Sequence, residues 1–439
     1  MRIPGANPYV RRRALLIGST CFGLVMARPV FPQTHLVNDR LCIADNPNLH
    51  KLTAEQLQSR LNSFRDLGFG MIRTGIGRYG LHPEQDTPDL VQKLAFARQA
   101  ITTGYKLKLQ VGSWSAPPEE VLRVHSEARI LNRLGETPPD FLSPWYPGLK
   151  DLLRRQAEAF FAYIARTGLM PAVTALIVDL GPAGEPIYPA AWVLGKEAPA
   201  DYSFWFYDEY AQAAFGRDMQ FRYSNDIRRA NRRWQADFKT WADVQIPHPK
   251  SHPGAMWEDV ITWYRDAKRA VIRFQVSTCK ALVAQHYKAA VQPQIIMLVP
   301  GSHLRADEIR QAISTGDGDY GVKLMLDTEF VLDLAHEQGC AVQYTGAENE
   351  PEVEYVLQYM QSKGYAMSVW AENAGGDAAL NPERLAGIVI KANLYGLDYI
   401  NANSVVAVDG VTPNSVMPKL ASACKRLLNI FPVRSGDEI

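Results

Sequence analysis

The feature that most constrains this fold is a repeated alternation of short apolar segments with amphipathic helical segments. Eight segments have the character of buried strands: 40–46, 70–77, 106–114, 173–185, 292–303, 340–350, 365–376 and 397–403. Helical patterns stand between most of them, as at 53–68 and 151–168. Such alternation predicts a parallel sheet covered by helices, and eight strand–helix units are the number in an α/β (β/α)8 TIM barrel.

A doubly wound open sheet is the competing architecture. It would place a glycine-rich nucleotide-binding turn directly after its first strand. The segment at that place reads "IADNPNLH" and contains no glycine. The sequence therefore favours the barrel.

The interval between the fourth and fifth predicted strands is unusually long. It contains an aromatic and charged helical segment, and we predict an inserted helical and loop segment at 195–260 within a barrel formed by residues 33–439. Loops after the strands of a barrel build its active site. The insertion is therefore either a wall or lid of the cleft, or a subdomain that only caps the barrel edge.

The first 32 residues have the layout of an export signal. Three arginines, Arg11 to Arg13, precede an apolar run that ends before Pro29 and Pro32. The run is too short for a stable membrane span, which needs about 20 residues, so we expect no stable membrane insertion. The arginines resemble a twin-arginine signal, which predicts a periplasmic or secreted protein. Alternatively, residues 14–25 form the first buried strand and the protein is cytoplasmic.

Charge and motif content exclude several classes of function. The chain carries 47 basic and 46 acidic residues, so nothing in its net charge of +1 favours binding to nucleic acid. No His, Cys or carboxylate spacing indicates a metal site, and no glycine-rich turn indicates a nucleotide. We therefore predict no cofactor. The sequence does not indicate an oligomeric state.

Two glutamates follow apolar strands directly and are flanked by glycine or proline. Glu185 lies in "LGPAGEPIYP" after the fourth strand, and Glu372 lies in "VWAENAGG" in the seventh. In a barrel, both carboxylates face one cleft across its mouth. Glycoside hydrolysis needs such a pair, with one carboxyl protonated to assist the leaving oxygen and one ionised to activate water or to attack. Glu348, in "GAENEPE", is a rival for the second role if the strand count is shifted by one.

These two motifs resemble the segments around the general acid and the general base of the β-amylase family, glycoside hydrolase family 14. "MLVPGSH" is similar to that family's strand-five segment, which ends in a substrate-binding histidine. "YTGAENEPE" is similar to its strand-six inner loop. The resemblance implies an inverting hydrolase in which Glu185 donates the proton, Glu372 is the base, and His303, Thr345 and Asn373 contact or support the sugar.

Other segments depart from that family. "MIRTGIGRYG" offers Arg73 where the family has an aspartate, and "GSWSAPPEE" replaces a glycine-rich loop and contains Trp114. We predict that Arg73, Trp114 and Tyr188 belong to the substrate-binding set. "WFYDEY" and "RRANRRW" in the insertion are more similar to the β-galactosidase-type barrels of family 42.

The expected activity is therefore hydrolysis of an oligo- or polysaccharide. Two alternatives stay open. One is a retaining β-galactosidase-type glycosidase with Glu372 as nucleophile, which the distance between the carboxyl groups distinguishes from the inverting enzyme. The other is an exported barrel that binds a glycan without cleaving it, since a fold does not guarantee activity.

Overall fold

The structure is a computed structural model of the whole chain. It describes residues 38–44, 49–66, 68–76, 87–112, 114, 119–138, 141–190, 203–346, 349–372 and 399–402. The predicted export signal at 1–32, the alternative first strand at 14–25, the rival Glu348 and the predicted site residue Asn373 lie outside these residues.

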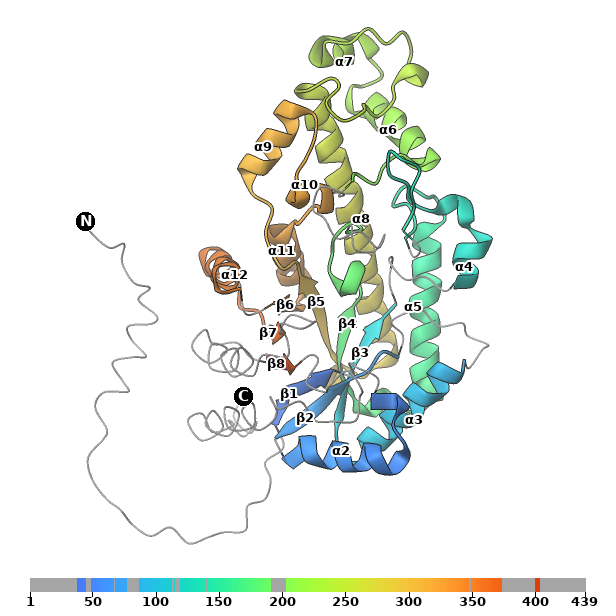
Figure 1. The fold of residues 1–439 in the computed structure, drawn as a ribbon, viewed down its shortest axis with the longest axis vertical. Coiled ribbons are helices and arrows are strands. Elements are labelled where there is room, and N and C mark those ends of the chain that lie inside the picture. Colours follow the sequence, from blue (N-terminus) through green and yellow to red (C-terminus); the bar gives the residue numbers. More distant parts are fainter. Residues whose placement is uncertain are drawn as a thin grey trace, which may run out of the picture.

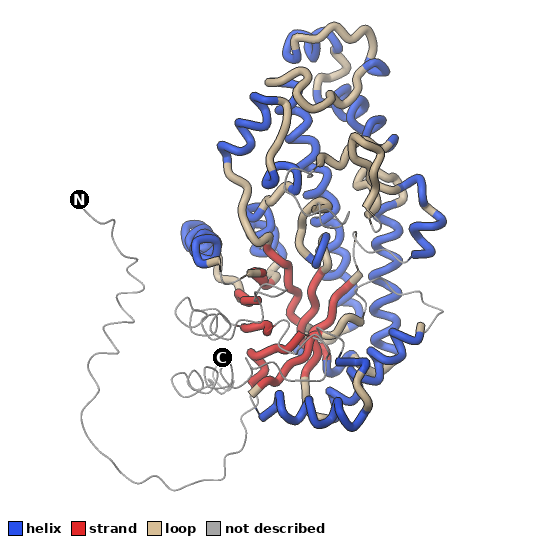
Figure 2. Tube along the Cα trace, in the orientation of Figure 1, coloured by secondary structure: helices blue, strands red, loops and turns tan. Residues whose placement is uncertain are grey.

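Eight parallel strands form a closed barrel in sequence order, as Figures 1 and 2 show. The strands are β1 (Asn38–Ala44), β2 (Phe69–Arg73), β3 (Lys106–Val111), β4 (Val173–Val178), β5 (Gln294–Val299), β6 (Ala341–Thr345), β7 (Val369–Glu372) and β8 (Tyr399–Ala402). Pairing of β1 with β8 closes the ring. The predicted (β/α)8 barrel is confirmed, and each strand lies within or overlaps its predicted segment.

Side chains alternate between the two faces of the barrel wall. A small inner cluster contains Ala175 and Ile177 of β4, Ile296 and Leu298 of β5, and Trp370 of β7. Leucines, valines and isoleucines at the intervening positions pack outward against the helices in the largest core cluster. Because strand residues alternate with period two, one apolar run supplies both cores.

Helices cover the outside of the barrel: α2 (Ala54–Asp66), α3 (Pro88–Thr102), α5 (Leu149–Arg166), α8 (Ala255–His286), α11 (Thr328–Gln338) and α12 (Glu350–Lys363). Helix α2 begins as its sequence predicts, because the Thr53 Oγ1 atom accepts from the Gln56 backbone N–H, and the Gln56 side chain accepts from the Thr53 N–H. Short 3-10 turns flank some of these elements: η1 (Leu49–Lys51), η3 (Met170–Ala172) and η8 (Ala289–Val291).

The described part of the β4–β5 insertion is helical. It contains α6 (Glu209–Arg222), α7 (Ile227–Trp234), η7 (Trp241–Asp243) and the first part of α8, which runs from these elements down to the barrel in Figure 1. A second hydrophobic cluster, rich in aromatic residues, joins the insertion to α4 (Glu119–Val124), η2 (Ser126–Ala128) and the loop before α5. The insertion therefore packs around an aromatic core that it shares with these segments. We call the described part of the insertion, residues 203–260, the cap.

Buried Asp259 on α8 organises the polar contacts inside the cap. Its carboxylate accepts from the Tyr223 hydroxyl at 2.5 Å and from the Trp234 indole N–H at 2.8 Å, and it pairs with Arg222. These donors come from α6, α7 and the turn that joins them. A single carboxylate thus fixes three segments of the cap on the long helix.

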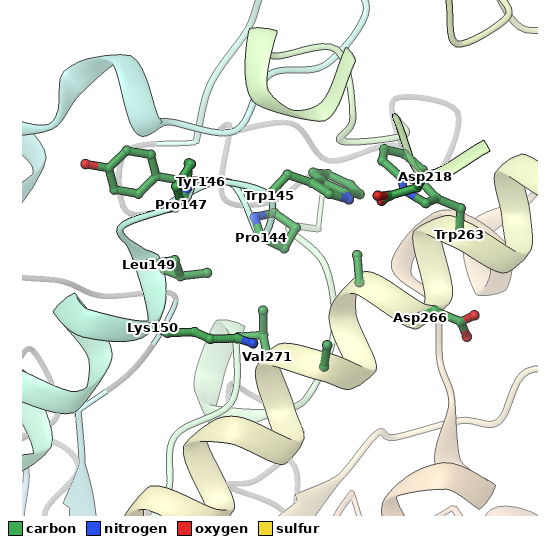
Figure 3. Close-up of a pocket in the computed structure, with 12 residues that line it drawn as sticks. Pro144, Trp145, Tyr146, Pro147, Leu149, Lys150, Asp218, Trp263, Asp266 and Val271 are labelled. Carbon is green, nitrogen blue, oxygen red and sulfur yellow. The ribbon is translucent and has the colours of Figure 1, made fainter. Parts of the chain in front are cut away.

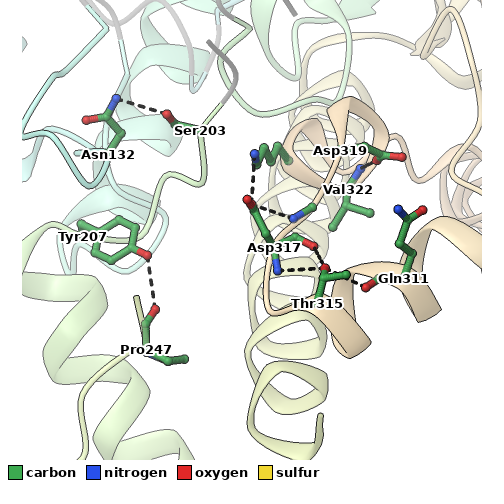
Figure 4. Close-up of polar contacts among 11 residues, drawn as sticks. Asn132, Ser203, Tyr207, Pro247, Gln311, Thr315, Asp317, Asp319 and Val322 are labelled. Carbon is green, nitrogen blue, oxygen red and sulfur yellow. Dashed lines mark hydrogen bonds and ion pairs between the residues drawn. The ribbon is translucent and has the colours of Figure 1, made fainter. Parts of the chain in front are cut away.

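Figure 4 shows further contacts of the cap. Within the cap the Tyr207 hydroxyl donates to the Pro247 carbonyl at 3.3 Å, and from outside it the Asn132 side chain donates to the Ser203 hydroxyl at 3.5 Å. On the other side, α9 (Ala306–Thr315) and α10 (Tyr320–Leu324) are joined by a turn in which Asp317 pairs with Lys323 at 3.1 Å. Within the described residues, no helix is long and apolar enough to cross a membrane.

Candidate active site

Three of the predicted site residues are the last residues of their strands. Arg73 is the last residue of β2, Thr345 of β6 and Glu372 of β7, and Thr345 stands beside Glu372 in the register of the β6–β7 pair. The strands of a parallel barrel end on one face, so the topology brings these three side chains to the same mouth.

Glu185 is held there by a tight turn after β4. Gly181 has no room for a side chain, because a Cβ atom would lie 2.1 Å from the Glu185 carbonyl oxygen. The 3-10 turn η4 (Pro182–Gly184) follows, and Gly184 has a φ of +92°, in the region that favours glycine. The Glu185 N–H then donates to the Pro182 carbonyl at 3.0 Å. The glycines and the proline therefore fix the direction in which Glu185 leaves the strand.

The chain after Glu185 is fixed from outside the barrel. Buried Lys268 on α8 donates to the Pro186 carbonyl at 2.6 Å and also to the carbonyl of Met325. The Trp205 indole N–H donates to the Pro189 carbonyl at 2.8 Å. The insertion therefore supports the loop that carries Glu185.

The environment of Glu185 favours its protonated form. Burial, and then the negative charge of Glu372, raise the pKa of its carboxyl group to about 7, although the nearby Thr345 hydroxyl lowers it. A carboxyl group with a pKa near neutrality can donate a proton at physiological pH.

Glu372 is buried, with only 3% of the residue exposed, and its two oxygens have different partners. Oε1 accepts from the Arg73 guanidinium at 2.8 Å, and Oε2 accepts from the side-chain amide of Gln343. The contact with Arg73 is a buried ion pair, which compensates for bringing the carboxylate out of water. Among the described residues, Glu372 thus lies close to a positive charge, whereas the charge that acts on Glu185 is the negative charge of Glu372.

Lys108 and Gln343 belong to this site, although neither is among the predicted residues. Lys108, in the middle of β3, is fully buried and donates to the side-chain oxygen of Gln343 on β6. Its nitrogen lies 3.8 Å from the centroid of the Trp370 ring, and burial lowers the pKa of its ammonium to about 7. The available signal was a lysine inside an apolar strand, "KLKLQV", at a position that faces inward.

His303 lies after β5 and contacts α12. Its Nδ1 atom is 2.6 Å from Oε2 of Glu352, and its ring stacks on Tyr355 with 3.7 Å between centroids. The structure therefore places the imidazole against two residues of that helix, with 18% of the side chain exposed.

Trp114 and Tyr188 are fully buried in the second hydrophobic cluster. The Trp114 indole N–H donates to the Leu142 carbonyl at 2.7 Å, and its ring meets Tyr188 edge to face. Tyr188 stacks on Tyr264 with 3.9 Å between centroids, and its hydroxyl donates to the Tyr264 carbonyl. Both aromatic faces are covered, so these residues join the Glu185 loop to the cap in this structure.

A separate pocket of about 440 Å³ lies between the loop before α5 and one face of α8 (Figure 3). Trp145 and Trp263 stack beside it with 4.3 Å between centroids, and Asp218 accepts from the Trp263 indole N–H. None of the residues that line it belongs to the predicted site. In the described part of the chain, no three His, Cys, Asp or Glu side chains converge as metal ligands.

No known protein family profile matches the sequence, and no curated protein is significantly similar to it. Solved structures do match. The catalytic domain of β-amylase from Paenibacillus polymyxa aligns with a TM-score of 0.67 and 16% identity, over 88% of this chain and 98% of that domain.

Two β-galactosidases match over a similar share of this chain. The enzyme from the psychrophilic Marinomonas ef1 has a TM-score of 0.59 and 11% identity, over 89% of this chain and 60% of its own length. A catalytic mutant of a family 42 β-galactosidase from G. stearothermophilus has a TM-score of 0.56 and 12% identity, over 91% and 57%. This chain therefore spans rather more than half the length of those enzymes.

These alignments show that the chain has a (β/α)8 barrel fold similar to that of the β-amylase domain and the β-galactosidases. At such identities the alignments establish the fold and not one family within it.

Proposed function

We propose that this protein is a glycoside hydrolase in which Glu185 is the general acid and Glu372 is the general base. The observation that carries the proposal is the contrast between the two carboxyl groups. The half-buried Glu185 has a raised pKa, whereas the carboxylate of Glu372 on β7 accepts from Arg73 on β2 and from Gln343 on the neighbouring strand β6. Environments that separate the proton affinities of two carboxyl groups are the requirement of glycosidase chemistry.

The steps follow from these assignments. Glu185 gives its proton to the glycosidic oxygen as the bond between that oxygen and the anomeric carbon breaks. Glu372 takes a proton from a water molecule as the water oxygen bonds to the anomeric carbon on the opposite face. The product then has inverted configuration, Glu185 ends ionised, and Glu372 ends protonated.

Thr345 and Arg73 have supporting roles in this proposal. Thr345 stands beside Glu372 in the β6–β7 register and lowers the pKa of Glu185, and Arg73 keeps the carboxylate of Glu372 in place. We assign His303 and Asn373 to the substrate side of the cleft on the sequence resemblance alone. The substrate is an oligo- or polysaccharide, and we retain the proposal that residues 1–32 direct export to the periplasm or medium.

The test is a hydrolysis screen of α-glucans against β-linked galactosides and glucans, with the first-formed anomer identified by proton NMR. We expect turnover by the wild type, with inverted configuration, and a loss of turnover in both Glu185→Gln and Glu372→Gln. Glu158→Gln, at an exposed position on α5, is the matched control and keeps its activity.

Other outcomes identify the alternatives. A first product that keeps the substrate's anomeric configuration assigns Glu372 as a nucleophile and favours the retaining alternative. Equal sugar binding by the wild type and both variants, without turnover by any of them, identifies a glycan-binding barrel and contradicts the proposal.

A further inference from the structure

A chain of polar contacts crosses the interior of the barrel beneath the proposed base. Lys108 on β3 donates to Oε1 of Gln343 on β6, and Nε2 of Gln343 donates to Oε2 of Glu372 on β7. All three side chains are buried, with at most 3% of each residue exposed. Apolar side chains, among them Ile177, Ile296 and Trp370, share the barrel interior with these three residues.

The chemistry of an amide makes the order of these contacts important. The two ends of a glutamine side chain have opposite character, because the oxygen accepts and the nitrogen donates. Below its pKa of about 7 Lys108 is an ammonium, which only donates and therefore selects the oxygen end of Gln343. The nitrogen end is then left to face Glu372.

The reversed amide is unfavourable at this site. It would direct the Gln343 oxygen at a carboxylate oxygen, and a buried pair of acceptors without a proton is costly. The other oxygen of Glu372 accepts from Arg73, so the Gln343 and Arg73 donors together orient the plane of the carboxylate. Loss of the Gln343 donor removes one of these two contacts.

The surroundings of Lys108 keep its nitrogen in place. The Trp370 ring lies 3.8 Å from it, and the charged or titratable groups that act on it are Cys42 on β1, Arg73 on β2 and Glu372. The register of β2 with β3 sets Arg73 beside Lys108. Residues of four other strands, β1, β2, β6 and β7, therefore surround the Lys108 amine.

We propose that Lys108 and Gln343 are positioning residues for Glu372: Lys108 selects the orientation of the Gln343 amide, and the amide fixes the carboxylate. The expected effect on kcat rests on the proposed function, whereas the orientation of the Gln343 amide does not depend on whether the protein turns over a substrate. Neither residue contacts the reacting atoms in this scheme.

The catalytic test is a double-mutant cycle in kcat with Lys108→Met and Gln343→Met. Misplacing a catalytic group by a fraction of an ångström to 1 Å costs up to about 100-fold in rate, so we expect each single variant to lose roughly 10- to 100-fold in kcat with KM within about twofold. The effect of Lys108→Met is expected to vanish in the Gln343→Met background, because Lys108 acts through the amide. Lys106→Met, at the exposed start of the same strand, is the matched control and leaves kcat unchanged.

The structural test is the side-chain amide signal of Gln343 in nitrogen–proton NMR, identified by its absence in Gln343→Met. It is recorded in the Glu185→Gln background, so that Glu185 does not titrate. We expect two resolved and slowly exchanging amide protons, and at least tenfold faster exchange with solvent after Lys108→Met, but not after Lys106→Met.

The outcomes separate the two proposals. If Glu372→Gln keeps its turnover, the proposed function is wrong, and the amide signal still decides whether Lys108 orients Gln343. An amide signal unchanged by Lys108→Met overturns the inference, as do additive losses in the kcat cycle. If the Lys108→Met protein does not fold, the kcat of Gln343→Met alone provides the test. An unchanged kcat in Gln343→Met also overturns the inference.

Discussion

The raised pKa of Glu185 has a measurable cost in stability. A carboxyl group whose pKa is raised by folding binds its proton more tightly in the folded than in the unfolded state. This contribution is absent below the ordinary pKa of 4.5, where Glu185 is protonated in both states. As the pH rises above 4.5, the raised pKa lowers the free energy of unfolding. The loss reaches its full size above about pH 7, where the folded protein holds Glu185 as a carboxylate.

The size of the effect follows from the same values. Each pKa unit corresponds to about 1.36 kcal/mol, so the rise from 4.5 to about 7 corresponds to a cost of roughly 3 kcal/mol at alkaline pH. Replacing Glu185 with glutamine removes the charge and keeps the size of the side chain. We therefore compare the free energy of unfolding of Glu185→Gln with that of the wild type at each pH. This difference is expected to shift in favour of the variant by roughly 3 kcal/mol between pH 4.5 and pH 8.

The assay is urea unfolding of both proteins at several values of pH between 4.5 and 8. The quantity of interest is the difference in free energy of unfolding between variant and wild type, and it should increase with pH. Glu158→Gln, exposed on α5, is the control for which the difference stays flat. A difference for Glu185→Gln that is independent of pH, or that decreases as the pH rises, would refute the reasoning.

Three further predictions concern the same site and its supports. In Glu372→Gln the pKa of Glu185 is expected to fall, because a nearby negative charge is removed, and carbon NMR titration of the Glu185 carboxyl checks this; an unchanged or higher pKa contradicts the proposed proximity. Lys268→Met leaves the carbonyls of Pro186 and Met325 without their donor, and urea unfolding should show a loss of about 1–3 kcal/mol; no loss would mean that α8 does not hold the Glu185 loop. Asp259→Asn weakens the contacts of the cap on α8, with an expected loss of about 1–3 kcal/mol by the same assay, and unchanged stability would exclude its organising role.

The insertion shows what tertiary packing adds to local sequence. Its composition predicts helices, but not what they pack against. In the structure the described part packs around an aromatic core shared with α4, η2 and the loop before α5, while Lys268 and Trp205 donate to carbonyls of the loop after Glu185. The insertion and the helix that follows it therefore support the loop of the predicted acid.

The surroundings of several predicted site residues could not be read from the sequence near them. Trp114 and Tyr188 have aromatic faces that suit sugar rings, and the structure covers both faces with other side chains. His303 stands where the resemblance to β-amylases implies a sugar contact, and it pairs with Glu352 on α12. Sequence gives the chemical capacity of a side chain, whereas its neighbours decide how much of that capacity stays available.

By itself, the sequence determined the order and approximate place of the eight strands, because strand periodicity and apolar runs are local properties of the chain. It also determined that Glu185 follows β4 and that Glu372 closes β7, since glycine, proline and carboxylate positions are read directly. The tertiary structure decided what surrounds these carboxyl groups. Arg73 pairs with Glu372 across 299 residues of chain, and Lys108 meets Gln343 across 235. Contacts at such separations depend on how the barrel closes, and closure fixes the register that no local pattern encodes.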